Sequence, residues 1–153
     1  MTPEVNAILE KIVGQPCTRK EVGSMRSLSL GFGEESIDIK RRDRQYRLWE
    51  LGTYSGDWKI VNDAGVVLAK GMSSDIGELD FKLQTLQIGR FVSIQQLSKA
   101  DVRLKLDGGV TVDFYGDNNN DDEYFHVFCP ENVYIEFSER GWQVGRSDVP
   151  WKF

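Results

Sequence analysis

Residues 101–115 predict a β-hairpin whose register can be read from the residue types alone. A two-residue loop at 107–108 would place apolar and polar side chains together on both faces. A three-residue loop at 107–109, ending in a glycine that is free to adopt a positive φ, separates them. The predicted pairs are then Leu106 with Val110, Leu104 with Val112, Val102 with Phe114, Lys105 with Thr111 and Arg103 with Asp113. One face becomes apolar and the other carries an ion pair, as a half-buried antiparallel sheet requires.

The same alternation recurs along most of the chain and predicts further strands. We expect strands around 26–32, 37–39, 46–51, 90–97 and 124–128, and hairpins over 58–69 and 133–144. The predicted partners in these hairpins are Val61 with Val66, Ile60 with Val67, Phe137 with Trp142 and Ile135 with Val144. The run 66–69 is apolar on both faces, which predicts a strand in the middle of the structure.

Two segments have helical periodicity instead. Residues 3–13 suit an amphipathic helix that Thr2 caps and Gly14 ends. A second helix should begin at Asp75, because Glu78 three residues later completes the spacing of a capping box.

Many strands joined by tight turns, with only two helices, predict an α+β fold. We expect a mostly antiparallel twisted sheet built from hairpins, with an N-terminal helix and one central helix packed on it. No internal repeat and no linker are found, so residues 1–153 are expected to form a single domain.

The net charge is −5, and the acidic excess lies in the second half of the chain. Residues 77–153 hold 8 Lys and Arg against 13 Asp and Glu, whereas residues 1–76 hold 11 of each kind. This balance argues against a nucleic-acid-binding protein, which needs positive charge along the phosphate path. No apolar run approaches the roughly 20 residues of a membrane span, and the N-terminus lacks the features of a signal peptide. The chain is therefore predicted to be cytoplasmic, without membrane contact.

Residues that could perform catalysis are scarce. His126 is the only histidine, which excludes a metal site with two histidine ligands. Cys17 and Cys129 lack the spacing of a metal or redox motif, and they are predicted to be two unrelated buried thiols or, alternatively, a bridge. Glycine motifs for phosphates or dinucleotides do not occur. We therefore expect a protein that is not an enzyme and that uses no cofactor.

A polar loop follows residue 115 and invites comparison with a calcium site. Asp117, Asn119 and Asp121 match the first three ligand positions of an EF-hand. However, Asp122 stands where that loop needs glycine, and Phe128 stands where it needs the bidentate glutamate. No metal site is predicted.

The same loop offers a negatively charged surface, since it holds four carboxylates between two tyrosines. The predicted partner-binding residues are Asp117, Asp121, Asp122, Glu123, Tyr115 and Tyr124. Such a cluster would attract a basic protein partner, for example the nuclease domain of a toxin. The basic run 40–47 is the alternative functional surface, although a solvated loop or a charged edge strand also explains it.

His126 has two interpretations. It shares a strand face with Tyr124 and Phe128, which favours a structural histidine whose nitrogens are satisfied. Alternatively, it and one nearby carboxylate belong to a pocket, which would make the protein a small-molecule binder or an enzyme. In a third interpretation, the apolar chain end at 149–153 mediates dimerisation; the sequence does not decide the oligomeric state.

Three segments follow one another along the central and C-terminal parts of the chain. They are Phe81-x-Leu83-x-x-Leu86-x-x-Gly89-x-x-Val92, then Val102-x-Leu104-x-Leu106-Asp107-Gly108-Gly109-Val110-x-Val112, then the aromatic strand at 124–128. Over residues 26–145 the chain thereby resembles a family of small bacterial domains of unassigned function, some of which resemble immunity proteins encoded beside secreted toxins. The resemblance implies a bacterial binding protein that neutralises a cognate toxin by protein–protein contact, and it supplies no catalytic residues.

Overall fold

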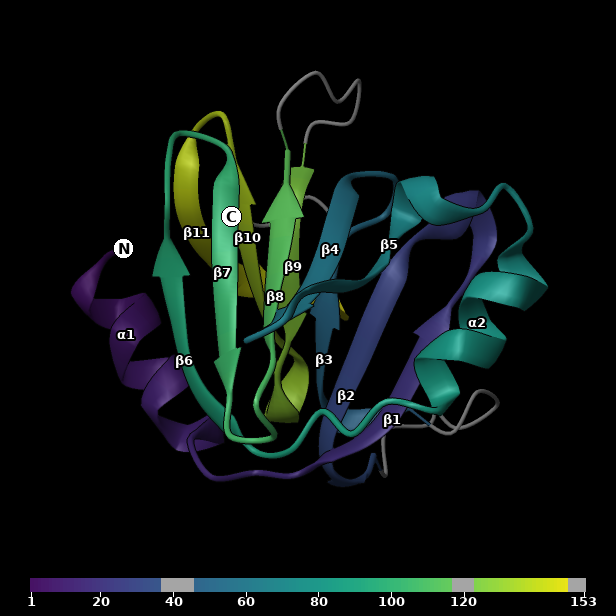
Figure 1. Ribbon diagram of the computed structural model, residues 1–153. Coiled ribbons are helices and arrows are strands. Elements are labelled where there is room, and N and C mark those ends of the chain that lie inside the picture. The colour runs from purple at the N-terminus through teal and green to yellow at the C-terminus, as the bar shows by residue number, and fades with distance from the viewer. Residues whose placement is uncertain (37–45, 117–122, 149–153) are drawn as a thin grey trace.

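The computed structural model describes residues 1–36, 46–116 and 123–148, which form two antiparallel sheets flanked by helices (Figure 1). The helices are α1 (Pro3–Leu9) and α2 (Ile76–Gln84), and short 3₁₀ turns lie at Glu10–Ile12, Ser24–Arg26, Lys70–Met72 and Pro130–Asn132. The strands are β1 (Cys17–Val22), β2 (Leu28–Glu35), β3 (Arg47–Gly52), β4 (Asp57–Asn62), β5 (Gly65–Ala69), β6 (Phe91–Gln96), β7 (Asp101–Leu106), β8 (Thr111–Tyr115), β9 (Glu123–Phe128), β10 (Val133–Ser138) and β11 (Gly141–Arg146).

Some predicted features fall outside the described residues. These are the strand at 37–39, most of the basic run 40–47, the carboxylates of Asp117, Asp121 and Asp122, and the chain end at 149–153. Within the described part of the chain, no helix has the length and apolar character that crossing a bilayer requires.

The predicted α+β fold is confirmed, and its strands divide between two sheets. The six-stranded sheet has the order β1-β2-β3-β9-β10-β11, and the five-stranded sheet has the order β5-β4-β8-β7-β6. Strands from both halves of the chain meet inside each sheet, because β3 pairs with β9 and β4 pairs with β8.

The strand order contains a repeat that the residue types do not reveal. Each half of the chain begins with a helix, continues as a three-stranded meander and then forms a hairpin. The hairpin β4–β5 leaves its own meander and pairs with β8, the third strand of the other meander. In the same way, β9–β10 pairs with β3, and β11 extends that sheet. The prediction of no internal repeat therefore misses a duplicated topology with exchanged hairpins.

The two halves also meet at equivalent points, just before their first meander strands. Gly14 donates its backbone N–H to the carbonyl oxygen of Phe91, and Cys17 donates to that of Gly89, both at 2.9 Å. Gly14 and Gly89 have φ values of 85° and 89°, in the left-handed region that favours glycine. Glycine at each position thus lets the chain turn from its helix into the junction.

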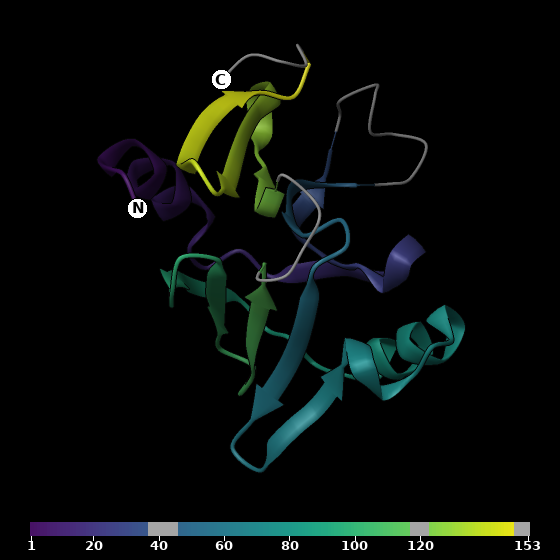
Figure 2. The same ribbon diagram turned by 90° about the horizontal axis from the view of Figure 1, so that it is seen from above.

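The hydrophobic core lies between the two sheets. Phe114 of β8 and Phe125 of β9 meet there, with ring centroids 5.0 Å apart. Leu79 of α2 and Val5 of α1 are fully buried and belong to the same apolar cluster. Figure 2 shows the two helices at opposite ends of the layered sheets. Burial of an aliphatic or aromatic side chain of this size contributes about 1.5–3 kcal/mol.

The predicted helix starts are confirmed by their caps. The Thr2 hydroxyl accepts the N–H of Val5 at 3.2 Å. The Asp75 carboxylate accepts the N–H groups of Gly77 and Glu78 at 2.9 and 3.3 Å. Both side chains satisfy backbone donors that the first turn of a helix leaves unpaired.

The predicted registers of two hairpins are also confirmed. In β7–β8, the observed pairs are Val102 with Phe114, Arg103 with Asp113, Leu104 with Val112 and Lys105 with Thr111. Gly109 has a φ of 85°, as the three-residue loop requires. In β10–β11, the observed pairs are Phe137 with Trp142 and Ile135 with Val144.

The β4–β5 hairpin differs from its prediction in two respects. Val61 pairs with Val66 as expected, but a register shift makes Ile60 pair with Leu68 instead of Val67. The strand β5 lies at the edge of the five-stranded sheet, where 51% of Val66 is exposed, so the prediction of a central strand is wrong. An apolar run alone does not distinguish a central strand from an edge strand that has only one face covered.

Replacement of the two junction glycines by alanine should separate strain from steric clash. Gly14→Ala should lower the free energy of unfolding by about 1–2 kcal/mol through the strain of a left-handed backbone alone, since a Cβ at this position meets no atom within 4 Å. Gly89→Ala should cost roughly a further 1–3 kcal/mol, because its Cβ would lie 2.4 Å from the Gly108 nitrogen. Urea unfolding of both variants measures the difference, and equal losses would contradict this account of the junction.

Candidate functional site

The face of the six-stranded sheet that points away from the core carries an unusual set of buried and half-buried polar residues. Ser29 of β2, Glu50 of β3 and His126 of β9 alternate with the core residues of their strands. Only 3% of Glu50 and 6% of His126 are exposed. Buried polar groups of this kind are costly unless they are paired, so their partners define the site.

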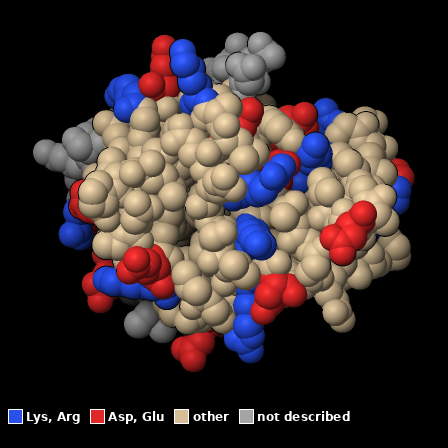
Figure 3. Space-filling model, turned by 60° about the vertical axis from the view of Figure 1, so that its left-hand side comes forward, with Lys and Arg blue, Asp and Glu red and all other residues tan. Residues whose placement is uncertain are grey.

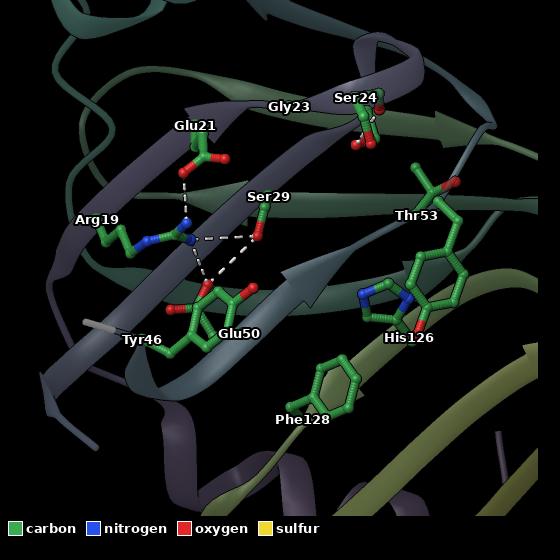
Figure 4. Close-up of a pocket in the computed structure, with 12 residues that line it drawn as sticks. Arg19, Glu21, Gly23, Ser24, Ser29, Tyr46, Glu50, Thr53, His126 and Phe128 are labelled. Atoms are coloured by element: carbon green, nitrogen blue, oxygen red, sulfur yellow. Dashed lines mark hydrogen bonds and ion pairs between the residues drawn. The ribbon is translucent and has the colours of Figure 1, made fainter. Parts of the chain in front are cut away.

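These residues line a pocket of about 350 Å³. It is walled by β1, β2, β3 and β9, by the turn between β1 and β2, and by the segments that flank β3 (Figure 4). The lining residues are Arg19, Glu21, Gly23, Ser24, Ser27, Ser29, Tyr46, Glu50, Thr53, Tyr54, His126 and Phe128. Both halves of the chain therefore contribute to it.

An ion-pair cluster forms one wall. Arg19 donates to the carboxylates of Glu50 at 2.9 Å and of Glu21 at 2.6 Å, and its guanidinium lies 4.8 Å from the ring centroid of Tyr46. The backbone N–H of Arg47 donates to the second oxygen of Glu50 at 2.7 Å. Each charged group of this wall thus has a partner of opposite charge or a hydrogen-bond donor.

Gly31 makes this wall possible. It lies between Arg19 and Glu50 in the sheet, where a Cβ would approach the Glu50 Oε2 to 2.5 Å and the Arg19 Cβ to 3.0 Å. Any larger residue would displace the ion pair, so glycine leaves the space in which the carboxylate lies.

A second polar group forms around His126. The Nδ1 atom of His126 contacts the Glu123 carboxylate, which also accepts the Tyr134 hydroxyl at 2.5 Å. The Glu123 carboxylate thus binds an imidazole and a phenol together, which fixes the orientation of the His126 ring. Among the described residues, Nε2 of His126 has no hydrogen-bond partner. The fully buried side-chain atoms without a partner in this part of the chain are Asp101 Oδ1 and Gln143 Oε1, so Nε2 is not one of them. Nε2 therefore remains accessible in the pocket.

Aromatic rings surround the imidazole. The ring centroids of Tyr54 and Phe128 lie 4.6 and 5.1 Å from that of His126. Tyr54 lines the pocket and is 52% exposed. The imidazole of His126 points into the pocket (Figure 4). The pocket therefore combines fixed polar groups with apolar ring surface, which is the usual composition of a ligand site.

The environment raises the pKa of two tyrosines beside this group. Burial is the main cause for Tyr134, and the nearby Glu123 carboxylate raises its pKa further. Burial and then Glu123 also raise the pKa of Tyr54. Both phenols are therefore held in their neutral form, because a second negative charge beside Glu123 is unfavourable.

The other sheet holds a related ion pair without the same surroundings. Asp113 of β8 is 1% exposed and accepts two hydrogen bonds from Arg103, at 2.8 and 3.0 Å. In the duplicated topology, β8 corresponds to β3, so Asp113 and Glu50 are buried carboxylates on equivalent strands, each held by an arginine. Figure 3 shows a further face, on which acidic and basic side chains are intermixed.

The predicted partner-binding residues do not form one exposed surface in the described chain. Glu123 begins β9 and is buried, because His126 and Tyr134 bind its carboxylate. Tyr124 is half-buried and packs edge-on against Phe137, and Tyr115 lies under the Lys59 ammonium. Asp117, Asp121 and Asp122 lie outside the described residues.

His126 satisfies parts of both predictions made for it. One nitrogen is bonded and the ring is buried, as expected of a structural histidine, yet the ring also lines a pocket. The sequence did not identify Arg19, Glu50 or Tyr54 as site residues. The alternating positions of Arg19 and Glu21 were the one available signal, since they place two charges on one face of β1.

Comparisons of this chain with protein families, with curated proteins and with solved structures find no match. The resemblance to a family of small bacterial domains therefore stays a prediction.

Tyr134→Phe should reduce the loss of stability at alkaline pH. The raised pKa of Tyr134 means that the unfolded chain ionises first, so the free energy of unfolding falls as the pH rises above about 10. At neutral pH the variant's free energy of unfolding should be about 1–3 kcal/mol below that of the native protein, because Glu123 loses a hydrogen-bond donor. Between pH 9 and pH 11, however, the free energy of unfolding should fall less in the variant than in the native protein. Urea unfolding at both pH values measures this, and parallel losses in the two proteins would contradict the assignment.

Proposed function

We propose that this protein is a non-enzymatic binding protein whose ligand occupies the pocket on the six-stranded sheet. The observation that carries the proposal is the combination of a pocket of about 350 Å³ with polar groups that burial and hydrogen bonds hold in fixed positions. A volume of this order suits a small molecule. Polar groups that are already ordered bind a ligand without a large entropic cost.

The hydrogen bonds of the site favour binding over catalysis. Among the described residues, the hydrogen bond of His126 goes to Glu123, and no serine of the pocket donates to the imidazole. Nucleophilic catalysis requires such a contact between a hydroxyl and its base. Ser29 donates to Glu50 at 3.3 Å instead, so it contributes to the ion-pair wall.

Neutralisation of a cognate toxin is a narrower proposal for the same kind of protein. It rests on the resemblance of residues 26–145 to a family with immunity-like members and on the acidity of the second half of the chain. Cytoplasmic location is part of this proposal, and the free thiols of Cys17 and Cys129 are compatible with a reducing compartment.

The pocket can be tested by its effect on thermal stability. A small molecule that binds the folded state at 100 times its Kd should stabilise the protein by about 2.7 kcal/mol. A library of polar small molecules should therefore contain compounds that raise the Tm. Tyr54→Ala should abolish this rise, because Tyr54 lines the pocket and its exposed ring can be removed without opening the core.

Phe81→Ala is the matched control for this experiment. Phe81 lies on α2, is 74% exposed and does not line the pocket, so the variant should respond to ligand as the native protein does. Ligands that stabilise the native protein and Tyr54→Ala equally would contradict the proposed site, and so would a library without any stabilising compound.

A further inference from the structure

The charged side chains of the pocket wall are bound to each other. Arg19 pairs with Glu21 at 2.6 Å and with Glu50 at 2.9 Å. Glu50 also accepts the backbone N–H of Arg47 at 2.7 Å. A ligand with a net charge would have to displace one of these partners, and breaking a buried ion pair is costly. The wall therefore favours a ligand without a net charge.

A hydroxyl group can join this network without breaking an ion pair. It donates and accepts through one oxygen, whereas an ammonium only donates and a carboxylate only accepts. Ser29 already does so, since its hydroxyl accepts from Arg19 at 3.5 Å and donates to Glu50 at 3.3 Å (Figure 4). Among the described residues, Arg19 is the one donor to the Glu21 carboxylate, which can accept further hydrogen bonds. The network thus has places for ligand hydroxyls.

The turn between β1 and β2 brings two more hydroxyls to the pocket, those of Ser24 and Ser27. The Ser24 hydroxyl has no hydrogen bond within the described chain. Between these serines, Met25 and Arg26 have φ values of 59° and 55°, in turn positions that glycine or asparagine normally occupies. The Arg26 guanidinium donates to two carbonyl oxygens of residues 70–73, at 3.0 and 3.1 Å, and so holds the turn in place. A strained segment that its surroundings fix is characteristic of functional sites.

Aromatic rings supply the apolar part of the site. The ring of Tyr54 lies 4.6 Å from that of His126, yet 52% of Tyr54 is exposed. Phe128 lies 5.1 Å from the same imidazole and also lines the pocket. Flat ring faces pack best against a flat apolar surface. A pyranose ring combines such a surface, formed by its C–H bonds, with several hydroxyls around its edge.

We propose that the pocket binds an uncharged monosaccharide unit, whose apolar face packs on Tyr54 and whose hydroxyls join the network of Ser24, Ser29 and Glu21. This inference rests on the proposed binding function and names the class of the ligand. The unit can be a free sugar or the end of a longer glycan. A pocket of about 350 Å³ is of the size that takes one small ring.

The probes are the methyl glycosides of glucose, galactose, mannose and N-acetylglucosamine. Each is titrated into isotopically labelled protein, and the backbone amides of Ser24, Ser29 and Tyr54 are followed by NMR. At least one glycoside should shift these signals and bind at least about tenfold more tightly than cyclohexanol, which has the same ring size but a single hydroxyl. No shift with any glycoside, or equal affinity for cyclohexanol, would overturn the sugar assignment. The binding function would still stand if other compounds raised the Tm and Tyr54→Ala removed that rise.

Charged derivatives of the sugar that binds test the preference for a neutral ligand. The corresponding uronate carries a carboxylate on the same ring, and the corresponding amino sugar carries an ammonium. Both should bind at least about threefold more weakly than the neutral glycoside, because the paired residues leave the added charge unbalanced. Equal or tighter binding of either derivative would overturn the selection of an uncharged ligand.

A trisaccharide that ends in the same sugar distinguishes the two sources. If it binds more tightly than the methyl glycoside and shifts the same signals, the ligand is the end of a glycan. Weaker binding at these signals assigns the free sugar. Shifts confined to residues away from the pocket would count against the proposal.

Ser24→Ala tests the hydroxyl network. Because the Ser24 side chain is exposed and bonds to no described residue, the fold should be unaffected, and the glycoside should bind about three- to tenfold more weakly. Ser93→Ala is the matched control, since Ser93 is exposed on β6 of the other sheet and does not line the pocket. Equal affinities of the two variants would overturn the role of Ser24.

Two substitutions of Tyr54 test the ring contact. Tyr54→Phe keeps the ring and should retain the affinity for the glycoside within about twofold. Tyr54→Leu keeps an apolar side chain without a flat face, and should weaken binding about three- to tenfold. Equal affinities of these two variants would show that the sugar does not pack on the ring, and would overturn that part of the assignment.

Discussion

Backbone pairing between the two halves of the chain is the constraint on which the rest of the structure depends. Strand β3 would be the open edge of its meander without β9, and β8 would be open without β4. Each exchange therefore covers an edge that would otherwise expose unpaired N–H and C=O groups. The pocket lies across one of these contacts, since Glu50 and His126 belong to strands from different halves. The site is thus a product of the interlocked topology.

The buried polar groups on the outer face of the six-stranded sheet are not explained by stability alone. A buried ion pair is often no more stabilising than well-packed apolar residues of similar volume. Glu50 nevertheless has two donors from Arg19 and Arg47, and Glu123 has two from His126 and Tyr134. Several side chains therefore serve as hydrogen-bond donors to two buried carboxylates, and an apolar sheet face would need neither the carboxylates nor these donors. The proposed ligand recognition would account for such an arrangement.

Local features of the chain could be predicted because they depend on neighbouring residues. Gly109 sets the loop of the β7–β8 hairpin, and Thr2 and Asp75 cap helices through groups two or three residues away. The same reasoning failed for residues 66–69, since the position of a strand within a sheet depends on distant partners. It also missed the duplicated topology, because equivalent strands such as β3 and β8 share a pattern of burial without sharing residues.

The sequence allowed a pocket near His126 as an alternative, but the other residues of the pocket could not be predicted, for the same reason. The pocket requires Gly31 to pair with Arg19 and Glu50, and Gly52 to pair with His126, over separations that no local pattern encodes. Of the residues that line the pocket, only His126 was predicted as a site residue, because it is the only histidine in the chain.

The exchanged hairpins have a consequence for synthesis of the chain on the ribosome. Residues 57–69 emerge well before β8 at 111–115, so the first hairpin has no sheet to join while the second half is still being translated. During that interval the nascent polypeptide presents apolar strands with unpaired edges. Translation speed, or a chaperone that shields those strands, would then determine how much of the protein escapes aggregation.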